Sequence, residues 1–301
     1  MLFETQNFLI KDVDTNSTLT YKEPESIYDM CWYPFMNSND PSSCCFAVSS
    51  KDQPIHLWDA YNGSLRASYA LIDHRERFVA PNSLCFTPDG TKILCGYFNS
   101  LAYFDVLTPG SDYTHIPLIA SRKSIDGQKG IVSALSVCQT RGLIAVGTYS
   151  KTIFLYDMET FEPVLMLPEF QSGLTQIEFS HDGNFLFTAS RCDDSIKVWD
   201  LRNCDEPLLE FPRKGMINQR LYFQLTSDYL ITGDTDGTVS FYDINCLETG
   251  RMVNKKIGRD SIPAAKLFGD LLVTCQGSRC FEDEEVEKNI SMWTIKNINF
   301  E

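Results

Sequence analysis

The chain contains 301 residues, 43% of them hydrophobic, which is enough to build one large folded domain or two ordinary ones. Its formal net charge of −14 argues against a general attraction of the whole molecule to nucleic acid, but it does not describe any single face. We expect no membrane segment, because no run of about 18 apolar residues occurs. The N-terminus lacks the basic and apolar regions of a signal peptide, so the 11 cysteines are expected in a reducing, intracellular setting.

The first 25 residues predict two short strands, at 6–10 and 17–21, and a repeat begins after them. Apolar runs that end in an aromatic residue and an aspartate recur every 43 to 52 residues, at Asp59, Asp105, Asp157, Asp200 and Asp243. A sixth run, "ISMWTIKN", keeps the tryptophan and replaces the aspartate. A period in the forties with several short strands in each unit is typical of the blades of a β-propeller.

The units also agree internally. Each opens with a strand and continues through a turn to a second strand that ends on small residues, before the aromatic-aspartate strand. The opening strands are expected at residues 26–33, 82–88, 131–137, 174–180 and 218–225. We therefore predict an all-β WD-repeat β-propeller over residues 26–301, with six readable repeats, or seven blades if the first is shortened. Residues 1–25 are expected to be a closing strand for the last blade or a remnant of a first blade.

Two acidic segments were weighed as cation sites. "GDTDG" at 233–237 faintly resembles a calcium loop but lacks its further ligands, so we expect an ordinary hairpin turn. "FEDEEVEK" at 281–288 is expected to be a solvated insertion in the last blade, and its partner stays open. With four histidines, no CxxC pair and no catalytic motif, we expect no metal, no cofactor, no small-molecule substrate and no enzymatic activity.

Basic residues concentrate in the loops that join one blade to the next, which gather on one face of a propeller. These loops hold eleven of the 26 lysines and arginines and five of the 40 acids. The hairpins of the same face add further lysines, an arginine and the aromatic residue Tyr149. Such a face suits single-stranded RNA, because charge follows the phosphates and aromatic rings stack on bases. A solvated rim without a ligand explains the pattern equally well.

A second motif ends the strand at residues 196–202. Trp199, Asp200 and Arg202 form a Trp-Asp-x-Arg ending that resembles the box by which some propellers dock on the adaptor of cullin-RING ubiquitin ligases. Pairing of Arg202 with neighbouring loops is the structural alternative.

Longer segments resemble the telomerase Cajal body WD-repeat family, which binds small Cajal-body RNAs. They are "IYDMCWYPFM", "SSKDQPIHLWDAYNGSLRASY", "NSLCFTPDGTKILCGY", "GQKGIVSAL", "DGNFLFTASRCDDSIKVWDLR" and "NQRLYFQLTSDYLITGDTDGTVSFYD". The resemblance covers residues 26 to 243 in order and spacing. One departure is that the family's propeller usually has a complete blade before "IYDMCWY", where this chain has about 25 residues.

The resemblance implies a non-enzymatic RNA-binding scaffold in the nucleus and the Cajal body, with some cytoplasmic protein allowed. Its expected partners are H/ACA-type small nuclear RNA, the H/ACA core proteins and the telomerase ribonucleoprotein, with protein partners on the propeller faces. The candidate RNA-binding residues are Lys51, Lys129, Tyr149, Lys151, Arg191, Arg213, Lys214, Asn218, Gln219 and Arg220. Of these, "NQR" at 218–220 is the strongest, offering one arginine and two amides. The alternatives are a ligase substrate receptor, a protein scaffold and a splicing-related nuclear factor.

Overall fold

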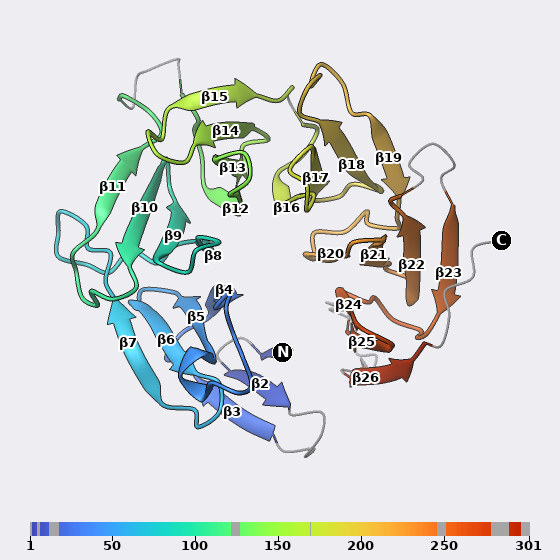
Figure 1. The fold of residues 1–301 in the computed structure, drawn as a ribbon, viewed down its shortest axis with the longest axis horizontal. Helices are drawn as coiled ribbons and strands as arrows, with labels where there is room; N and C mark the ends of the chain where they lie inside the picture. Colours follow the sequence, from blue (N-terminus) through green and yellow to red (C-terminus); the bar gives the residue numbers. More distant parts are fainter. Residues whose placement is uncertain are drawn as a thin grey trace. The chain divides into compact units, whose positions relative to one another are not determined.

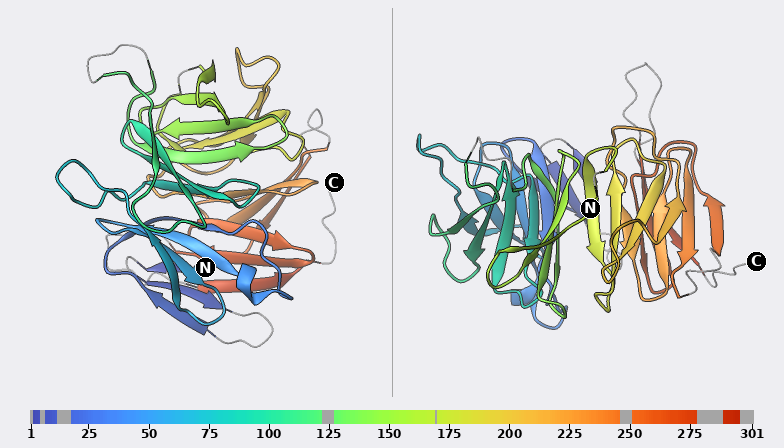
Figure 2. Two further views of the ribbon diagram at one scale, coloured as in Figure 1. Left: turned by 60° about the vertical axis from the view of Figure 1, so that its left-hand side comes forward. Right: turned by 90° about the horizontal axis from the view of Figure 1, so that it is seen from above.

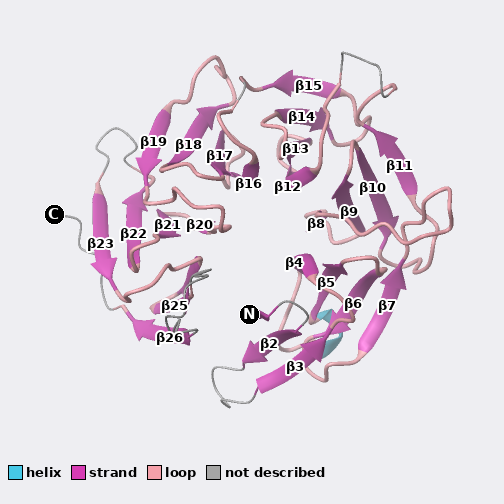
Figure 3. Ribbon diagram, turned by 180° about the vertical axis from the view of Figure 1, so that it is seen from behind, coloured by secondary structure: helices cyan, strands magenta, loops and turns pink. Residues whose placement is uncertain are grey.

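The computed structural model describes residues 2–4, 7–11, 18–121, 127–168, 170–245, 251–277 and 289–295. The predicted acidic insertion at 281–288 lies outside these ranges. The chain forms two compact units, the first of residues 1–150 and 154–166 and the second of residues 151–153 and 167–301. Within the described ranges every regular element is a strand except one short 3-10 turn, Pro41–Ser43 (Figure 3). The described part contains no helix with the length and apolar character needed to cross a membrane.

The first unit holds four antiparallel sheets (Figure 1). The N-terminal sheet has three strands, β1 (Leu2–Glu4), β2 (Asn7–Lys11) and β3 (Thr18–Lys22). The next sheet is formed by β4 (Ile27–Trp32), β5 (Cys45–Ser50), β6 (Ile55–Asp59) and β7 (Leu65–Tyr69). The third is formed by β8 (Ser83–Phe86), β9 (Lys92–Tyr97), β10 (Ser100–Asp105) and β11 (Thr114–Pro117). The fourth is formed by β12 (Val132–Cys138), β13 (Leu143–Thr148), β14 (Ile153–Asp157) and β15 (Pro163–Met166).

The second unit holds three further antiparallel sheets. Two have four strands: β16 (Leu174–Phe179), β17 (Phe185–Ser190), β18 (Ser195–Asp200) and β19 (Leu209–Pro212), then β20 (Phe223–Leu225), β21 (Tyr229–Gly233), β22 (Thr238–Asp243) and β23 (Met252–Lys256). The last described sheet consists of β24 (Ala264–Phe268), β25 (Leu271–Gln276) and β26 (Asn289–Thr294). Figure 2 shows the strands of single sheets running side by side.

Each four-stranded sheet is a meander whose strands pair in chain order, as the blades of a WD-repeat propeller do. The prediction of an all-β WD-repeat β-propeller is therefore confirmed. Over the described residues there are seven sheets, because β1, β2 and β3 form a three-stranded sheet in addition to those of the six repeats. The strands expected near the N-terminus are β2 and β3, and they pair with each other.

The repeated aspartates have a local structural role. Each stands at the end of the third strand of its sheet, and its Oδ1 accepts the backbone N–H two residues further on, at N···O distances of 2.8 to 3.0 Å. The acceptors are Asp59, Asp105, Asp157, Asp200 and Asp243. An aspartate that binds the backbone two residues on mimics a turn and fixes the chain direction between two strands. The sequence repeat is thus a repeat of one turn.

Neighbouring sheets approach closely where small residues end the second strand. In the first unit, a Cβ at Gly96 of β9 would collide with the side chains of Ser83 and Val132, and Val132 begins the next sheet. In the second unit, the amide of Gln176 bonds both the N–H and the carbonyl of Phe223, at 2.9 Å each. Gln224 does the same to Leu267. Side-chain amides therefore continue backbone hydrogen bonding from one sheet to the next.

A buried carboxylate connects the N-terminal segment to the second sheet. Glu23 is fully buried just after β3, and it accepts hydrogen bonds from Ser50 Oγ at 2.9 Å and from Trp58 Nε1 at 2.8 Å. The Nδ1 atom of His56 lies 2.9 Å from the same carboxylate. Tyr21 packs edge-on against Trp58, with 5.7 Å between ring centroids. A carboxylate buried with three polar partners is costly to disturb, so this contact fixes the first sheet on the second.

Candidate nucleic-acid interface

The strongest sequence candidates lie on one loop of the second unit, residues 213–222, which joins β19 to β20. The strand expected over 218–225 begins only at Phe223, so "NQR" belongs to this loop. The turn between β17 and β18 lies against it, because Cys192 N–H donates to the carbonyl of Ile217 at 3.2 Å. The Cys192 thiol also donates to Asn218 Oδ1 at 3.4 Å. The structure therefore brings Arg191 of that turn together with the 213–222 loop.

Arg213 is buried beneath this loop, with 5% of its surface exposed. Its guanidinium donates to the carbonyls of Leu221 at 3.2 Å and Ser190 at 3.3 Å. Burial lowers the pKa of this guanidinium, and three nearby aspartates, Asp193, Asp234 and Asp194, oppose that shift. A buried cation among backbone carbonyls and carboxylates holds a loop in place and cannot reach a ligand in this conformation. Arg213 therefore does not belong to the exposed surface on which the sequence analysis placed it.

Lys214 is exposed but already paired. Its Nζ lies 2.6 Å from Asp236 Oδ2, and 68% of the lysine side chain is exposed. The ion pair lowers the pKa of Asp236. Asp236 belongs to the "GDTDG" segment, which forms the turn between β21 and β22. An exposed ion pair of this kind is weak, so a phosphate can bind Lys214 only in competition with the Asp236 carboxylate.

The "NQR" residues serve different purposes. Asn218 is exposed, and its Oδ1 accepts a hydrogen bond from the Cys192 thiol. Gln219 is half-buried and donates from Nε2 to the carbonyl of Gly277 at 3.0 Å. Arg220 is half-buried over the ring of Tyr222, 5.4 Å from the ring centroid, and its Nη1 donates to the Tyr222 hydroxyl at 3.1 Å. The cation–π contact and the hydrogen bond to the same tyrosine restrict the orientation of this guanidinium.

In the first unit, Lys129 and Tyr149 are brought together. Lys129 is exposed, and the preceding Gln128 is fully buried, donating from Nε2 to the carbonyl of Val146 at 2.8 Å and accepting from the Tyr156 hydroxyl at 3.2 Å. The Tyr149 N–H donates to the carbonyl of Ile131 at 3.0 Å, which places the β13–β14 turn beside the loop of Lys129. A buried amide thus presents an exposed cation next to a half-buried aromatic ring.

The remaining two candidates stand apart. Lys51 lies in the β5–β6 turn with its Nζ 3.9 Å from Asp52, and 51% of its side chain is exposed. Lys151 is exposed in the β13–β14 turn with φ of +67°, and its carbonyl accepts the N–H of Phe170 at 3.1 Å. No contact joins either lysine side chain to the other candidates of its unit within the described part of the chain.

The adaptor-docking motif divides into buried and exposed parts. Trp199 is 3% exposed, and its Nε1 donates to Thr188 Oγ1 at 3.0 Å inside its own sheet. Arg202 is 67% exposed, and it makes a bidentate pair with Asp200, with Nη2 to Oδ2 at 2.6 Å. Only Arg202 is therefore available to a partner, and its guanidinium is occupied by the aspartate of its own turn.

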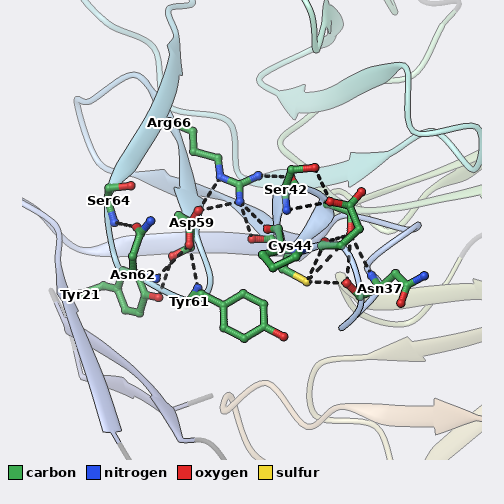
Figure 4. A network of polar contacts seen from close by, with 12 residues as sticks. Tyr21, Asn37, Ser42, Cys44, Asp59, Tyr61, Asn62, Ser64 and Arg66 are labelled. Atoms are coloured by element: carbon green, nitrogen blue, oxygen red, sulfur yellow. Dashed lines mark hydrogen bonds and ion pairs between the residues drawn. The ribbon is translucent and has the colours of Figure 1, made fainter.

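The second sheet contains a similar arginine with a structural role (Figure 4). Arg66 pairs with Asp59, Nη2 to Oδ2 at 2.6 Å, and also donates to the carbonyls of Pro41 and Cys44 at 2.9 and 3.1 Å. The arginine thereby joins the turn after β6 to the loop between β4 and β5. An arginine paired with the repeat aspartate can therefore have a structural role within its own sheet, without a partner protein.

The sequence analysis missed a cavity of about 320 Å³ in the first unit. It is lined by Leu71, Ile72, Asp73, His74, Val79, Tyr97, Tyr113 and His115. These residues come from the loop before β8, the end of β9 and the start of β11, and no spacing in the sequence relates them.

The sheets, their repeated turns and their exposed joining loops define a WD-repeat β-propeller protein, a class that carries function on surface sites. The "WD domain, G-beta repeat" family model matches residues 161–200. Telomerase Cajal body protein 1 of Bos taurus is 34% identical over 294 residues, covering 93% of this chain and 54% of that protein. The protein of the same name in Homo sapiens is 38% identical over 223 residues, covering 73% of this chain and 40% of that protein.

Guanine nucleotide-binding protein negative regulator 1 of Schizosaccharomyces pombe is 32% identical over 298 residues, covering 91% of this chain and 73% of that protein. The chain belongs to this WD-repeat family, which includes the telomerase Cajal body proteins. It spans about half the length of the Bos taurus relative. The crystal structure of the computationally designed Ika8 protein aligns with a TM-score of 0.61 at 15% identity, over 97% of this chain and 91% of that one, and is similar in fold alone.

Proposed function

We propose that this protein is a non-enzymatic RNA-binding scaffold for H/ACA-type small Cajal-body ribonucleoproteins, including the telomerase particle. In this role it directs the RNA and its core proteins to the Cajal body within the nucleus. Family membership supports the particle and the compartment, because the relatives are named for telomerase and the Cajal body. The acidic net charge is no obstacle, because RNA contacts use one local surface rather than the whole molecule.

One observation carries the RNA contact, namely the arrangement of Arg191, Asn218 and Arg220 around the 213–222 loop. The loop is held from beneath by Arg213 and by the Gly215 N–H, which donates to Asp194 Oδ1 at 2.9 Å. A fixed loop loses little conformational entropy when it binds. Asn218 then offers an amide to a base edge, and Arg220, held in a cation–π contact with Tyr222, offers charge to phosphate or to a base.

The test is to cross-link the full chain to RNA in cells, recover the protein and sequence the attached RNA. We expect enrichment of H/ACA-type RNAs with the unchanged protein and at least a tenfold loss with Arg220→Glu, because the substitution reverses the charge at the RNA surface. Arg202→Glu is the matched control, since Arg202 is an exposed arginine on a different turn. Enrichment no higher than for an unrelated propeller would refute the proposal.

Docking on a cullin-RING adaptor is the second candidate, and the exposure of Arg202 is the observation in its favour. The same variants separate the two functions. Recovery of an adaptor with the unchanged protein that is lost only with Arg202→Glu would favour a ligase substrate receptor. A splicing-related role would instead be seen as enrichment of spliceosomal RNAs in the same experiment.

A further inference from the structure

The cavity of the first unit is built from aromatic and apolar walls. Tyr97 and His115 both line it and contact each other, with ring centroids 6.2 Å apart and planes tilted by 48°. Tyr113 lines the same cavity and donates from its hydroxyl to the carbonyl of Ile72 at 3.1 Å. Its Leu71 wall belongs to the buried core, so the floor is fixed. The walls therefore suit a flat, partly apolar group that stacks on rings.

The polar groups at the rim are arranged for a negative rather than a positive ligand. Asp73 is the one carboxylate of the lining, and it already accepts the N–H groups of Arg77 and Arg75 and pairs with the Arg77 guanidinium at 2.9 Å. The hydrogen bond from the Arg77 N–H is the main cause that lowers the pKa of Asp73 to about 2. This carboxylate is thus occupied by groups of its own loop and has little capacity to attract a cation.

Two exposed cations remain near this site. Arg75 lies in the loop that supplies Asp73 and His74, and across the described residues its side chain makes no ion pair. Lys129 lies on a loop tied to the turn that follows Tyr97. There, Asn99 N–H donates to the carbonyl of Gly130 at 2.9 Å, and Gly130 N–H donates to Asn99 Oδ1 at 2.7 Å. Aromatic walls with exposed cations on adjoining loops match a base that carries a phosphate.

We propose that this cavity binds one unpaired nucleobase, stacked on the Tyr97, Tyr113 and His115 rings, with its phosphate directed to Arg75 or Lys129. The volume of about 320 Å³ is at the lower end of small-molecule pockets, near the size of a single nucleotide. The biological meaning of this subsite rests on the proposed RNA-binding function. Its chemistry does not, because a mononucleotide is a sufficient probe.

The four histidines provide a direct readout, because two of them, His74 and His115, line the cavity and the others do not. The full chain, labelled with ¹³C in histidine, is titrated by NMR with AMP, GMP, CMP and UMP, each to millimolar concentration. We expect at least one nucleotide to shift the Cε1–H signals of His74 and His115 in a saturable manner. The signal of His56, which is bound to Glu23, should stay in place, as should that of His181 in the second unit.

His115→Ala should weaken binding at least fivefold, read from the His74 signal, because it removes a stacking ring. His181→Ala is the matched control, an exposed histidine on the β16–β17 turn, and should leave the affinity unchanged. No saturable shift with any of the four nucleotides would overturn the inference. Equal shifts with N-acetyl-tyrosinamide would also overturn it, since they would identify an aromatic side chain of a protein partner as the occupant.

The outcomes also separate this inference from the proposed function. Cross-linking of H/ACA-type RNA without mononucleotide shifts would leave the scaffold role standing and remove the base pocket. Mononucleotide shifts without cross-linked RNA would keep the pocket and remove the H/ACA role.

Discussion

The loop at 213–222 of the second unit and the loop at 72–78 of the first both contain basic residues, but they use these charges differently. In the 213–222 loop, Arg213 is buried and Lys214 is paired with Asp236. In the 72–78 loop, Arg77 is used by Asp73 and Arg75 stays exposed at the rim of a cavity. A count of lysines and arginines therefore overestimates the charge that a ligand meets. The 213–222 loop is a rigid platform, and the 72–78 loop is the rim of a cavity with one available cation, Arg75.

The largest effect that would test this contrast comes from Arg213→Met. The variant removes the hydrogen bonds that the buried guanidinium donates to the carbonyls of Leu221 and Ser190. It also removes the attraction between this cation and three nearby aspartates, so the free energy of unfolding should fall by about 3 kcal/mol. Urea unfolding, followed by tryptophan fluorescence, measures this change. Lys214→Met, one residue along, should leave the midpoint unchanged because the pair with Asp236 is exposed. Equal midpoints for both variants would mean that Arg213 is not a structural cation.

A smaller effect concerns pH and sharpens the description of the platform. Burial raises the pKa of Asp234 to about 6, whereas in the unfolded chain this carboxyl keeps its usual value near 3.8. The folded state therefore holds this proton more tightly than the unfolded state does. Protonated Asp234 adds to the free energy of unfolding, and this addition is fully present below about pH 4 and is lost as the pH rises through 6. Asp234→Asn should abolish a decline of about 2 kcal/mol in unfolding free energy between pH 4.5 and 7.

The control for this variant is Asp205→Asn, an exposed aspartate of the same unit, which should keep the decline. Glu178 contributes in the same direction in both variants, because burial raises its pKa to about 7. The part of the pH dependence of the unfolding free energy that comes from Glu178 should therefore be the same in the unchanged protein and in both variants. A pH profile of Asp234→Asn that is parallel to that of the unchanged protein would show that Asp234 is ionised when folded.

The smallest effect concerns the available cation. Arg75→Ala should leave the urea midpoint unchanged, because the side chain is exposed. It should remove the preference of the cavity for a nucleoside monophosphate over the corresponding nucleoside, which we expect to be several-fold in the unchanged protein. Histidine NMR titrations with both ligands measure this ratio. Lys22→Ala, an exposed lysine on β3, is the control, and a ratio that Arg75→Ala does not change would assign the phosphate to Lys129 instead.

The repeat itself was predictable because its signals are local. Apolar alternation identifies strands, and the aspartates of the third strands bind their own turns two residues on. The predicted start of the strand at 218 was wrong, and the strand begins at Phe223, because Arg213 and Asp194 hold the preceding residues in a loop. That arrangement joins residues far apart in the chain, which a local pattern does not contain.

The candidate surface was predictable only in part for the same reason. An exposed position such as Lys129 follows from lying in a predicted joining loop. The burial of Arg213 does not, because it depends on the carbonyl of Leu221, later in the same loop, and on that of Ser190 at the end of β17. The cavity is the extreme case, since His74 and His115 meet there only through the packing of the 70–82 loop on the third sheet.

The buried Glu23 sets a limit on how the chain can be shortened. Any version that starts after this residue deprives Trp58 Nε1 and Ser50 Oγ of their acceptor, and both groups lie inside the second sheet. Tryptophan and serine are residues of the repeat itself, so the loss would be felt in a region that a domain map would call intact. The N-terminal segment thus completes the hydrogen bonding of the first complete repeat, and its removal would leave buried donors of that repeat without an acceptor.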